Sequence, residues 1–338
     1  MTATPLKTID VVGVCNALVD LLIHVKQKDL EKLKLSKGIM HLVSSTQQEE
    51  ILKYFAQAPV MQEIGGPTLN LIRVLARLNQ KTVFTGMVGR DVFGRSIKDR
   101  LHKLGIVGKV YDHDTQATGS CIVLVTPDGE RTMNTHLGAS QCYNATHLPA
   151  EEIKKSKFLH FCGYQWDGNE QRRCILEAIA VAKKYGTKVS FDLADPFVVR
   201  NHRDDFLSLI RKYADVVFAN REEALILQPG EPLEKIAQAI ANSGAIAVIK
   251  RGADGALIVD GRQGAMTKIN IPPHPIKVID TTGAGDTFAA GFLYGLVNDK
   301  SLESCGKIAA ILATDVISRM GVQWSDEAFA KVEQFPQK

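Results

Sequence analysis

Several features that would set a chain apart from ordinary globular proteins are missing from these 338 residues. No stretch approaches the roughly 18 consecutive apolar residues that a membrane-spanning helix needs. The apolar start of the chain is interrupted by Asp10, Asn16 and Asp20 and lacks a basic leader, so it predicts a first strand and not a signal peptide. No lipidation signal closes the chain. We therefore expect a cytoplasmic protein that does not bind membranes.

Charge of one sign and closely spaced cysteines are also lacking. The 41 basic and 37 acidic residues give a net charge of +4, and no basic run of the kind that follows a phosphate backbone is present. We therefore expect no nucleic-acid partner. The six cysteines are widely scattered, with no C-x-x-C pair and no histidine at zinc-ligand spacing. This pattern favours buried free thiols over metal or redox chemistry.

The chain as a whole has 45% hydrophobic and 23% charged residues, a composition that allows it to bury a large core. From about residue 157 onward, short β-rich segments alternate with segments of helical period, as in KFLHFCG, RRCILEAIAVAKKYG and TKVSFDLA. This alternation is typical of a parallel sheet covered by helices. It predicts an α/β fold with a central, mostly parallel sheet and helices on both faces.

Two stretches, 16–45 and 115–137, do not follow this alternation. The second contains a strand, a turn at Pro127-Asp128-Gly129 and another strand. Together they predict a small β-rich lid. The α/β body that binds nucleotide and substrate would then consist of residues 1–15, 46–114 and 138–338.

The stretch DTTGAGDTFAAGF, residues 280–292, joins a glycine-rich loop directly to an apolar helix. It is not a Walker loop, because no G-K-[ST] follows the glycines. The unpaired N–H groups at the start of such a helix, together with its dipole, form a site for an anion such as a phosphoryl group. Asp286 would stand beside this site and could accept a proton. Taken alone, the residues leave a second reading open, in which Asp286 only caps the helix.

Three further motifs accompany this loop, in the order EIGGPTLNLIRVLARL (63–78), ANREEA (219–224) and VIKRGADGALIV (248–259). With DTTGAGDTFAAGF, they resemble the signatures of the ribokinase-like carbohydrate kinase family, also called the PfkB family. The resemblance covers most of the chain. It implies the ribokinase-like fold and a kinase that uses ATP and Mg²⁺.

The resemblance also implies roles for individual residues. Asp286 would be the catalytic base, assisted by Gly283, Ala284 and Gly285 in the anion site and by Arg131 from the lid. The residues implied in nucleotide binding are Asn220, Lys250, Gly252, Gly255, Thr281, Gly283 and Gly285. Glu223 and Asn220 would hold the magnesium ion in its outer shell, through water.

The resemblance extends over the whole chain to bacterial members of a branch that phosphorylates adenosine. The stretch VVGVCNALVD resembles the branch's first motif, with Asn16 and Asp20 at matching positions. The stretch DGERTMNTHLGAS resembles its lid segment, with Arg131 at the matching position. The implied reaction is transfer of a phosphoryl group from ATP to the 5′-hydroxyl of adenosine, giving AMP and ADP. The residues expected to bind the substrate are Asn16, Leu18, Asp20, Met40, Gly65, Gly66, Asn70, Leu137 and Tyr164. Their apolar members would form a slot for the base or, alternatively, belong to the lid core.

Alternatives remain open at this level. The acceptor could be another nucleoside, such as inosine or guanosine, or a free sugar, such as ribose or fructose. A nucleotide-binding regulator without turnover is the rival from another class. Two further questions stay open. One is whether a potassium ion binds near Asp280 and Thr282, and the other is whether the protein is a monomer or a homodimer. Pro67 departs from the small or hydroxyl residue common in the family, and His136 has no assigned place.

Overall fold

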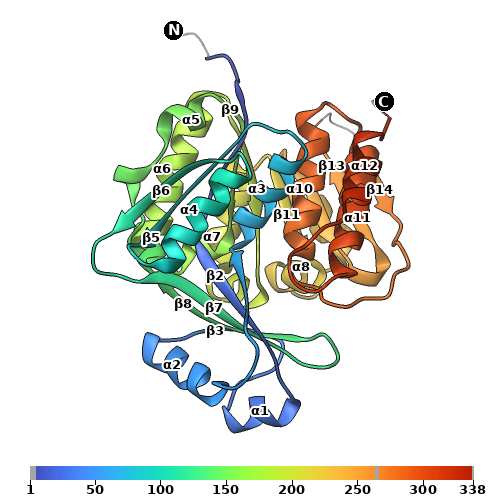
Figure 1. Cartoon of the computed structure of the whole chain (residues 1–338). Coiled ribbons are helices and arrows are strands. Elements are labelled where there is room, and N and C mark those ends of the chain that lie inside the picture. Colours follow the sequence, from blue (N-terminus) through green and yellow to red (C-terminus); the bar gives the residue numbers. More distant parts are fainter. Residues whose placement is uncertain (1–4, 263–265, 337–338) are drawn as a thin grey trace.

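The computed structural model describes residues 5–262 and 266–336, and its centre is a large, mostly parallel sheet (Figure 1). Nine strands form this sheet in the described part of the chain. Only the pairings of β12 with β13 and of β13 with β14 are antiparallel. In spatial order the strands are β14 (Thr267–Ile271), β13 (Ala256–Asp260), β12 (Ile246–Lys250), β11 (Val216–Asn220), β10 (Lys188–Asp192), β9 (Ser156–Cys162), β1 (Ile9–Val14), β5 (Thr82–Gly89) and β6 (Val107–His113).

Helices cover both faces of this sheet, which confirms the predicted α/β fold. Neighbouring strand residues point to opposite faces, so Val11 packs into one core and Val12 into the other. The core of Val11 includes residues of α3 (Pro67–Arg77), α4 (Val92–Lys103), α10 (Ala284–Val297), α11 (Leu302–Ile317) and α12 (Asp326–Glu333), and it continues to two helices beside a smaller sheet, α1 (Gln27–Lys32) and α2 (Ser45–Tyr54). Those that pack into the core of Val12 are α5 (Ala150–Lys154), α6 (Asn169–Lys184), α7 (Pro196–Tyr213), α8 (Arg221–Leu227) and α9 (Leu233–Ala241).

Helix α10 is the helix predicted from the glycine loop, and most of its length is buried. It lies against α11, and a β-carbon on Gly291 would come within 2.7 Å of the Cα atom of Ala309. A side chain at this position would force the two helices apart. The small residues of AAGF therefore anchor α10 closely, which holds its N-terminus in a fixed place.

A second, smaller sheet lies at one end of the molecule, at the bottom of Figure 1. Helices α1 (Gln27–Lys32) and α2 (Ser45–Tyr54) flank it, and the buried Gln48 of α2 donates hydrogen bonds to the carbonyl groups of Ser120 and Asn134. In spatial order its strands are β3 (Met40–Leu42), β8 (Arg131–Gly138), β7 (Thr118–Val125), β2 (Leu18–His24) and β4 (Met61–Gly65).

Four of these five strands, β2, β3, β7 and β8, fall in or overlap the segments predicted for the lid. The fifth, β4, lies within residues 46–114, the range predicted for the body, yet it pairs with β2. Its sequence, MQEIG, has little strand character of its own, and the pairing with β2 decides its place. The division of the chain into a body and a lid stays a prediction.

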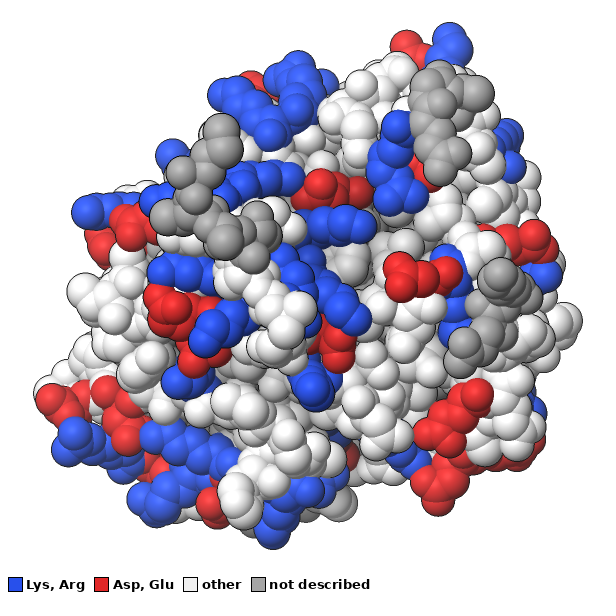
Figure 2. All heavy atoms as spheres, turned by 90° about the horizontal axis from the view of Figure 1, so that it is seen from above, with Lys and Arg blue, Asp and Glu red and all other residues white. Residues whose placement is uncertain are grey.

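The opposite end of the molecule is shown in Figure 2. Basic side chains gather there, with acidic ones interspersed. Some of them form ion pairs near the starts of the strands, as Lys157 does with Asp10 at 2.9 Å. No helix in the described residues combines the length and the apolar character that a membrane span requires. Within the same residues the cysteines are free thiols, and all but Cys142 are buried.

Candidate active site

A cavity of about 850 Å³ lies between the small sheet and the N-terminus of α10. The ends of β10, β11 and β12 open into the same space. All the site residues predicted from the sequence line this cavity, with the exception of Gly65. Below, the helix wall means the lining residues at the N-terminus of α10 and at the ends of β10 to β12. The sheet wall means the lining residues of the small sheet.

The helix wall begins at Gly283, the N-cap of α10, which adopts a left-handed conformation with φ of 70°. The first N–H groups of a helix have no partner within it. In this helix the N–H of Ala284 donates to the carbonyl of Thr281 at 3.2 Å. The N–H groups of Gly285 and Asp286, which also line the cavity, are therefore better placed to receive an anion, and the role predicted for Ala284 would require this bond to open.

Asp286 lies in the first turn of α10 and accepts a hydrogen bond from Nδ2 of Asn70 at 2.9 Å. Burial raises the pKa of Asp286 to about 6, although this hydrogen bond and the nearby Lys250 and Arg131 oppose the rise. The carboxylate thus ionises close to neutral pH, as a general base should. Asn70, predicted to contact the substrate, lies in the cavity beside the predicted base.

Lys250, at the end of β12, provides the positive charge of this wall. Its Nζ atom lies 2.8 Å from Oδ2 of Asp192, at the end of β10, and 3.1 Å from where a β-carbon on Gly285 would be. Burial alone would lower the pKa of Lys250, but the carboxylates of Asp192, Glu223 and Asp286 raise it instead. The ammonium group therefore stays charged beside the first turn of α10.

Asn220 and Glu223, predicted to hold magnesium through water, form a capping box at the start of α8. The backbone N–H of Asn220 donates to Oε2 of Glu223 at 2.7 Å, and its Nδ2 donates to Oε1 at 2.6 Å. Burial raises the pKa of Glu223 to about 8, with Lys250 opposing the rise. Among the described residues, no group of three or more His, Cys, Asp or Glu side chains could hold a metal directly. The arrangement fits outer-shell contacts to a hydrated ion better than direct ligation.

The sheet wall is mainly apolar, with one carboxylate. Its side chains come from successive positions on the cavity face of the strands, because the register pairs Asp20 with Cys121 and Cys121 with Thr135. Burial raises the pKa of Asp20 to about 7, although Arg131 opposes the rise. The residues of this wall are Leu18, Asp20, Met40, Leu42, Cys121, Val123, Arg131, Met133, Thr135 and Leu137.

Arg131 belongs to the sheet wall but reaches toward the loop before α10. Its Nε atom lies 4.0 Å from Oδ1 of the fully buried Asp280. The carboxylate of Asp280 accepts hydrogen bonds from the N–H and hydroxyl of Thr282 and from the N–H of Gly321. These bonds tie the loop before α10 to the segment after α11.

The remaining predicted residues lie around the junction of the two walls. Gly66 has a φ of 107°, and a β-carbon there would come within 2.5 Å of the carbonyl oxygen of Asn16. Asn16 itself accepts a hydrogen bond from Gln171 at 2.5 Å, and the hydroxyl of Tyr164 donates to Asp195 at 3.3 Å. Gly65 lies behind the carboxylate of Asp20.

Gly252, Gly255 and Thr281 line the outer part of the cavity. Pro67 also lines it and occupies the first position of α3, where a missing N–H does no harm. His136 does not line the cavity, and its Nδ1 atom lies 3.3 Å from the carbonyl oxygen of Val43.

The sequence motifs missed several residues of the site. Asp192 lies in the segment TKVSFDLA and is the last residue of β10, and its place at the carboxyl end of a parallel strand was a usable signal. Asp195 lines the cavity nearby, and the proline-rich segment 272–278 forms part of its rim. Arg73 touches Asn70 from behind, and nothing in the helical pattern of α3 marks it.

A helix N-terminus, a lysine and a carboxylate that open into one cavity are the groups that phosphoryl transfer to a small molecule requires. A family model described as pfkB family carbohydrate kinase matches residues 44–328, and the chain belongs to this family. This membership makes it a phosphotransferase with an alcohol group as acceptor.

Individual relatives point to the same class. Adenosine kinase 2 of Arabidopsis thaliana is 30% identical over 284 residues, which are 78% of this chain and 80% of the relative. The structure of adenosine kinase from Sinorhizobium meliloti is 30% identical with a TM-score of 0.90, and the match covers 96% of this chain and 99% of that one. A probable sugar kinase protein from Rhizobium etli CFN 42 is 32% identical with a TM-score of 0.91, over 97% and 99% of the two chains.

Proposed function

We propose that this protein transfers the γ-phosphoryl group of ATP to the 5′-hydroxyl of adenosine, giving AMP and ADP. The observation that carries the proposal is the cavity, which places the N-terminus of α10 and Asp286 opposite an apolar wall that contains Asp20. The helix N-terminus suits a phosphoryl group, and the sheet wall suits a purine attached to a ribose. The resemblance to adenosine kinases supports the choice of acceptor.

In the proposed reaction, Asp286 accepts the proton of the 5′-hydroxyl. A bond forms between the 5′-oxygen and the γ-phosphorus, while the bond between the γ-phosphorus and the bridging oxygen of ADP breaks. The loose transition state of phosphoryl transfer needs little deprotonation in advance. A carboxylate with a pKa of about 6 is therefore a sufficient base.

Charge on the transferring group is stabilised from both walls. The N–H groups of Gly285 and Asp286 and the ammonium of Lys250 act from the helix wall, and Arg131 acts from the sheet wall. Gly252, Gly255, Thr281 and Asn220 line the part of the cavity proposed for ATP. Hydrated Mg²⁺, with Glu223 and Asn220 in its outer shell, would supply charge to the phosphates.

The acceptor is held by polar groups at the ribose and apolar groups at the base. Asp20 accepts hydrogen bonds from the ribose hydroxyls, with Asn16 and Asn70 as further amide partners. Leu18, Met40 and Leu137 pack against the base, and Tyr164 lies at the edge of the slot. Segments 16–45 and 115–137, which form most of the small sheet, are proposed to close over the substrates and exclude water.

The test is an assay of the purified protein with ATP and magnesium against adenosine, inosine, guanosine, ribose and fructose. We expect adenosine to have the highest kcat/KM. A preference for ribose or fructose would contradict the choice of acceptor and favour a sugar kinase, the activity named for the Rhizobium etli relative. Nucleotide binding with no turnover on any acceptor would instead favour the non-catalytic regulator. Assays with and without K⁺ and gel filtration test the cation and the choice between monomer and homodimer.

A further inference from the structure

Arg73 is a buried guanidinium behind the cavity, 5% exposed, on the face of α3 that turns away from solvent. One of its terminal nitrogens (NH1) donates to the carbonyl of Ile64 at 3.3 Å and to Oδ1 of Asn70 at 3.2 Å. The other (NH2) donates to the carbonyl of Val322 at 3.3 Å. The guanidinium also packs over the ring of Trp324, with its carbon 5.1 Å from the ring centre. Arg73 thus ties α3 to β4 and to the segment after α11.

The contact with Asn70 has a chemical consequence. A guanidinium has only donors, so it can face the oxygen of the Asn70 amide but not its nitrogen. With Oδ1 turned to Arg73, Nδ2 must point the other way, and it lies 2.9 Å from Oδ2 of Asp286. If the amide turned over, its oxygen would face a carboxylate and its nitrogen a guanidinium. Arg73 therefore fixes which end of Asn70 meets Asp286.

We propose that Arg73 is a positioning residue of the reaction, which acts through Asn70 to orient Asp286 and keep it ionised. The hydrogen bond from Asn70 occupies Oδ2 of Asp286 and leaves Oδ1 for the hydroxyl of the acceptor. Donation from an amide also favours the charged form of a carboxylate. This inference rests on the proposed role of Asp286 as the base.

Other charged groups surround both partners and must be separated from this effect. Asp286 faces Lys250 from β12, Asp192 from β10, Arg131 from β8 and Asp20 from β2. Arg73 faces Glu63 of β4, at 3.8 Å, as well as Arg100 of α4 and Asp20. The charge of Arg73 therefore also acts on Asp20 directly, and only the effect that passes through Asn70 supports the proposal.

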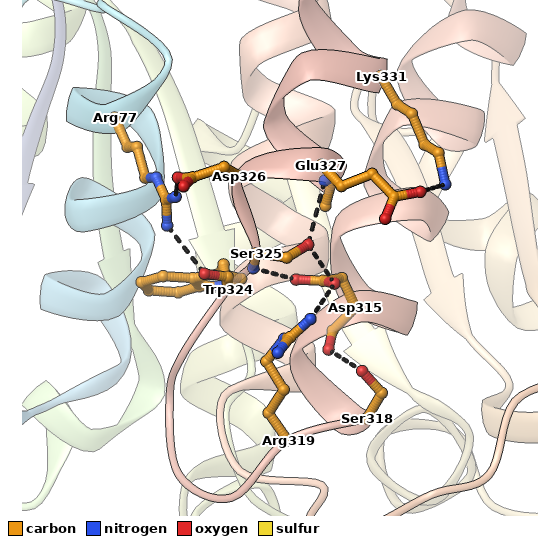
Figure 3. A network of polar contacts seen from close by, with 10 residues as sticks. Arg77, Asp315, Ser318, Arg319, Trp324, Ser325, Asp326, Glu327 and Lys331 are labelled. Carbon is orange, nitrogen blue, oxygen red and sulfur yellow. Dashed lines mark hydrogen bonds and ion pairs between the residues drawn. The ribbon is translucent and has the colours of Figure 1, made fainter.

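Arg77 is a matched control one turn along the same helix. It also holds the C-terminal segment, because it donates to the carbonyl of Trp324 at 3.1 Å and pairs with Asp326 (Figure 3). Its guanidinium packs over the ring of Phe329 as well. Figure 3 also shows the hydrogen bonds by which Asp315 holds Ser325 in this segment. The side chain of Arg77 bonds to this segment and not to Asn70, so its loss should weaken the attachment of the segment without turning the amide.

The first experiment compares the pH profiles of kcat for the wild type, Arg73→Met, Arg73→Lys and Arg77→Met. For Arg73→Met we expect the acid limb to move upward by about one to two pH units, because Asp286 loses an oriented donor. The loss of kcat should be about tenfold at pH 6 and should largely disappear near pH 9. Arg73→Lys should recover part of the shift, and Arg77→Met should keep the wild-type profile. An equal loss at every pH, or the same shift in Arg77→Met, would overturn the proposal.

The second experiment is a double-mutant cycle between Arg73→Met and Asn70→Ala, read as kcat at pH 6. If Arg73 acts through Asn70, the double variant should lose no more than the less active of the two single variants. Any effect on Asp20 should persist in the Asn70→Ala background and appear in KM for the nucleoside. Losses in kcat that multiply would show that Arg73 acts independently of Asn70, which contradicts the proposal.

Circular dichroism and thermal unfolding identify which variants are folded before the profiles are compared. If Arg73→Met does not fold, Arg73→Gln against Arg77→Gln decides the question, because glutamine also carries an acceptor and no longer fixes the amide of Asn70. A wild-type acid limb in Arg73→Gln counts against the proposal. Failure of the proposed function is recognised separately. If the wild type prefers another acceptor, the pH profiles are measured with that acceptor. This result would contradict only the choice of adenosine and not the proposed role of Arg73. If Asp286→Asn keeps full turnover, the assignment of Asp286 as the base is wrong.

Discussion

The helix wall and the sheet wall of the cavity differ in how their polar groups are held. On the helix wall, Asp286 is bonded to Asn70, Lys250 to Asp192, and Asn220 to Glu223, so each of these side chains has a protein partner before any ligand arrives. On the sheet wall, most side chains around Asp20 are apolar, and burial influences its pKa more than the nearby charges of Arg131 and Arg73 do.

This difference separates the two tasks of the site. A preorganised polar wall suits charge that develops during the reaction, because its dipoles need no reorientation. An apolar wall with one carboxylate suits selection of the acceptor, because it binds a molecule with a flat apolar group and a pair of hydroxyls more tightly than one without them. Changes in the helix wall should therefore reduce kcat, and changes in the sheet wall should mainly raise KM for the acceptor.

The largest effect is expected for Asp286→Asn, which keeps the shape of the side chain and removes the base. We expect kcat to fall by about 10² to 10⁴, in line with the loss of a general base. Steady-state assays measure the fall, and calorimetry with ADP should show nucleotide affinity largely kept. Turnover close to that of the wild type would contradict the assignment of Asp286.

Lys250→Met removes the positive charge beside the first turn of α10. It also leaves Asp192 without its ion-pair partner at 2.8 Å. We expect kcat to fall by about 10²-fold, the size of effect seen when one electrostatic contact to a transition state is lost. Lys268→Met is the control, because Lys268 lies on the edge strand β14 and its side chain is 44% exposed. A rise in KM with kcat unchanged would place Lys250 in binding alone.

The sequence predicted single residues of the site better than the contacts between them. Asp286 was found because its motif is continuous, and the loop and helix that place it are neighbours in the chain. Lys250 was predicted too, but not its ion pair with Asp192, because the two residues are 58 positions apart. Arg73 and Val322 are 249 positions apart, so only the folded chain brings each of these pairs together. The place of β4 in the small sheet was not foreseen for a similar reason, since its pairing with β2 and not its own composition decides that place.

Asp20→Asn tests the carboxylate of the sheet wall. We expect KM for the nucleoside to rise by about tenfold to a hundredfold, because a charged acceptor of hydrogen bonds from the ribose is lost. In the wild type, KM should fall as the pH rises through about 7, where Asp20 ionises. A loss in kcat with an unchanged KM would move Asp20 to the chemical step.

Asp20→Asn should weaken substrate binding but stabilise the fold. The pKa of Asp20, about 7 in the fold, exceeds the value of about 3.9 in an unfolded chain. Ionisation therefore costs stability, and the cost grows as the pH rises from about 3.9 to about 7 and is constant above that range. Because asparagine cannot ionise, the free energy of unfolding of Asp20→Asn should rise relative to that of the wild type by about 2 kcal/mol between pH 5.5 and pH 8. Urea titrations at the two pH values measure this difference.

The smallest effect is expected on the apolar part of the sheet wall. Met40 is 5% exposed and lines the cavity on β3, the short edge strand of the small sheet. Met40→Ala should raise KM for adenosine by about tenfold or less, since it removes a few buried methylene-sized groups. Met40→Leu should stay near the wild type because it restores the volume. Neither should change kcat or the KM for ribose, which has no base to fill the slot. Equal losses for adenosine and ribose would show that Met40 supports the lid core and not the base, and the contrast between the two walls would then reduce to Asp20 alone.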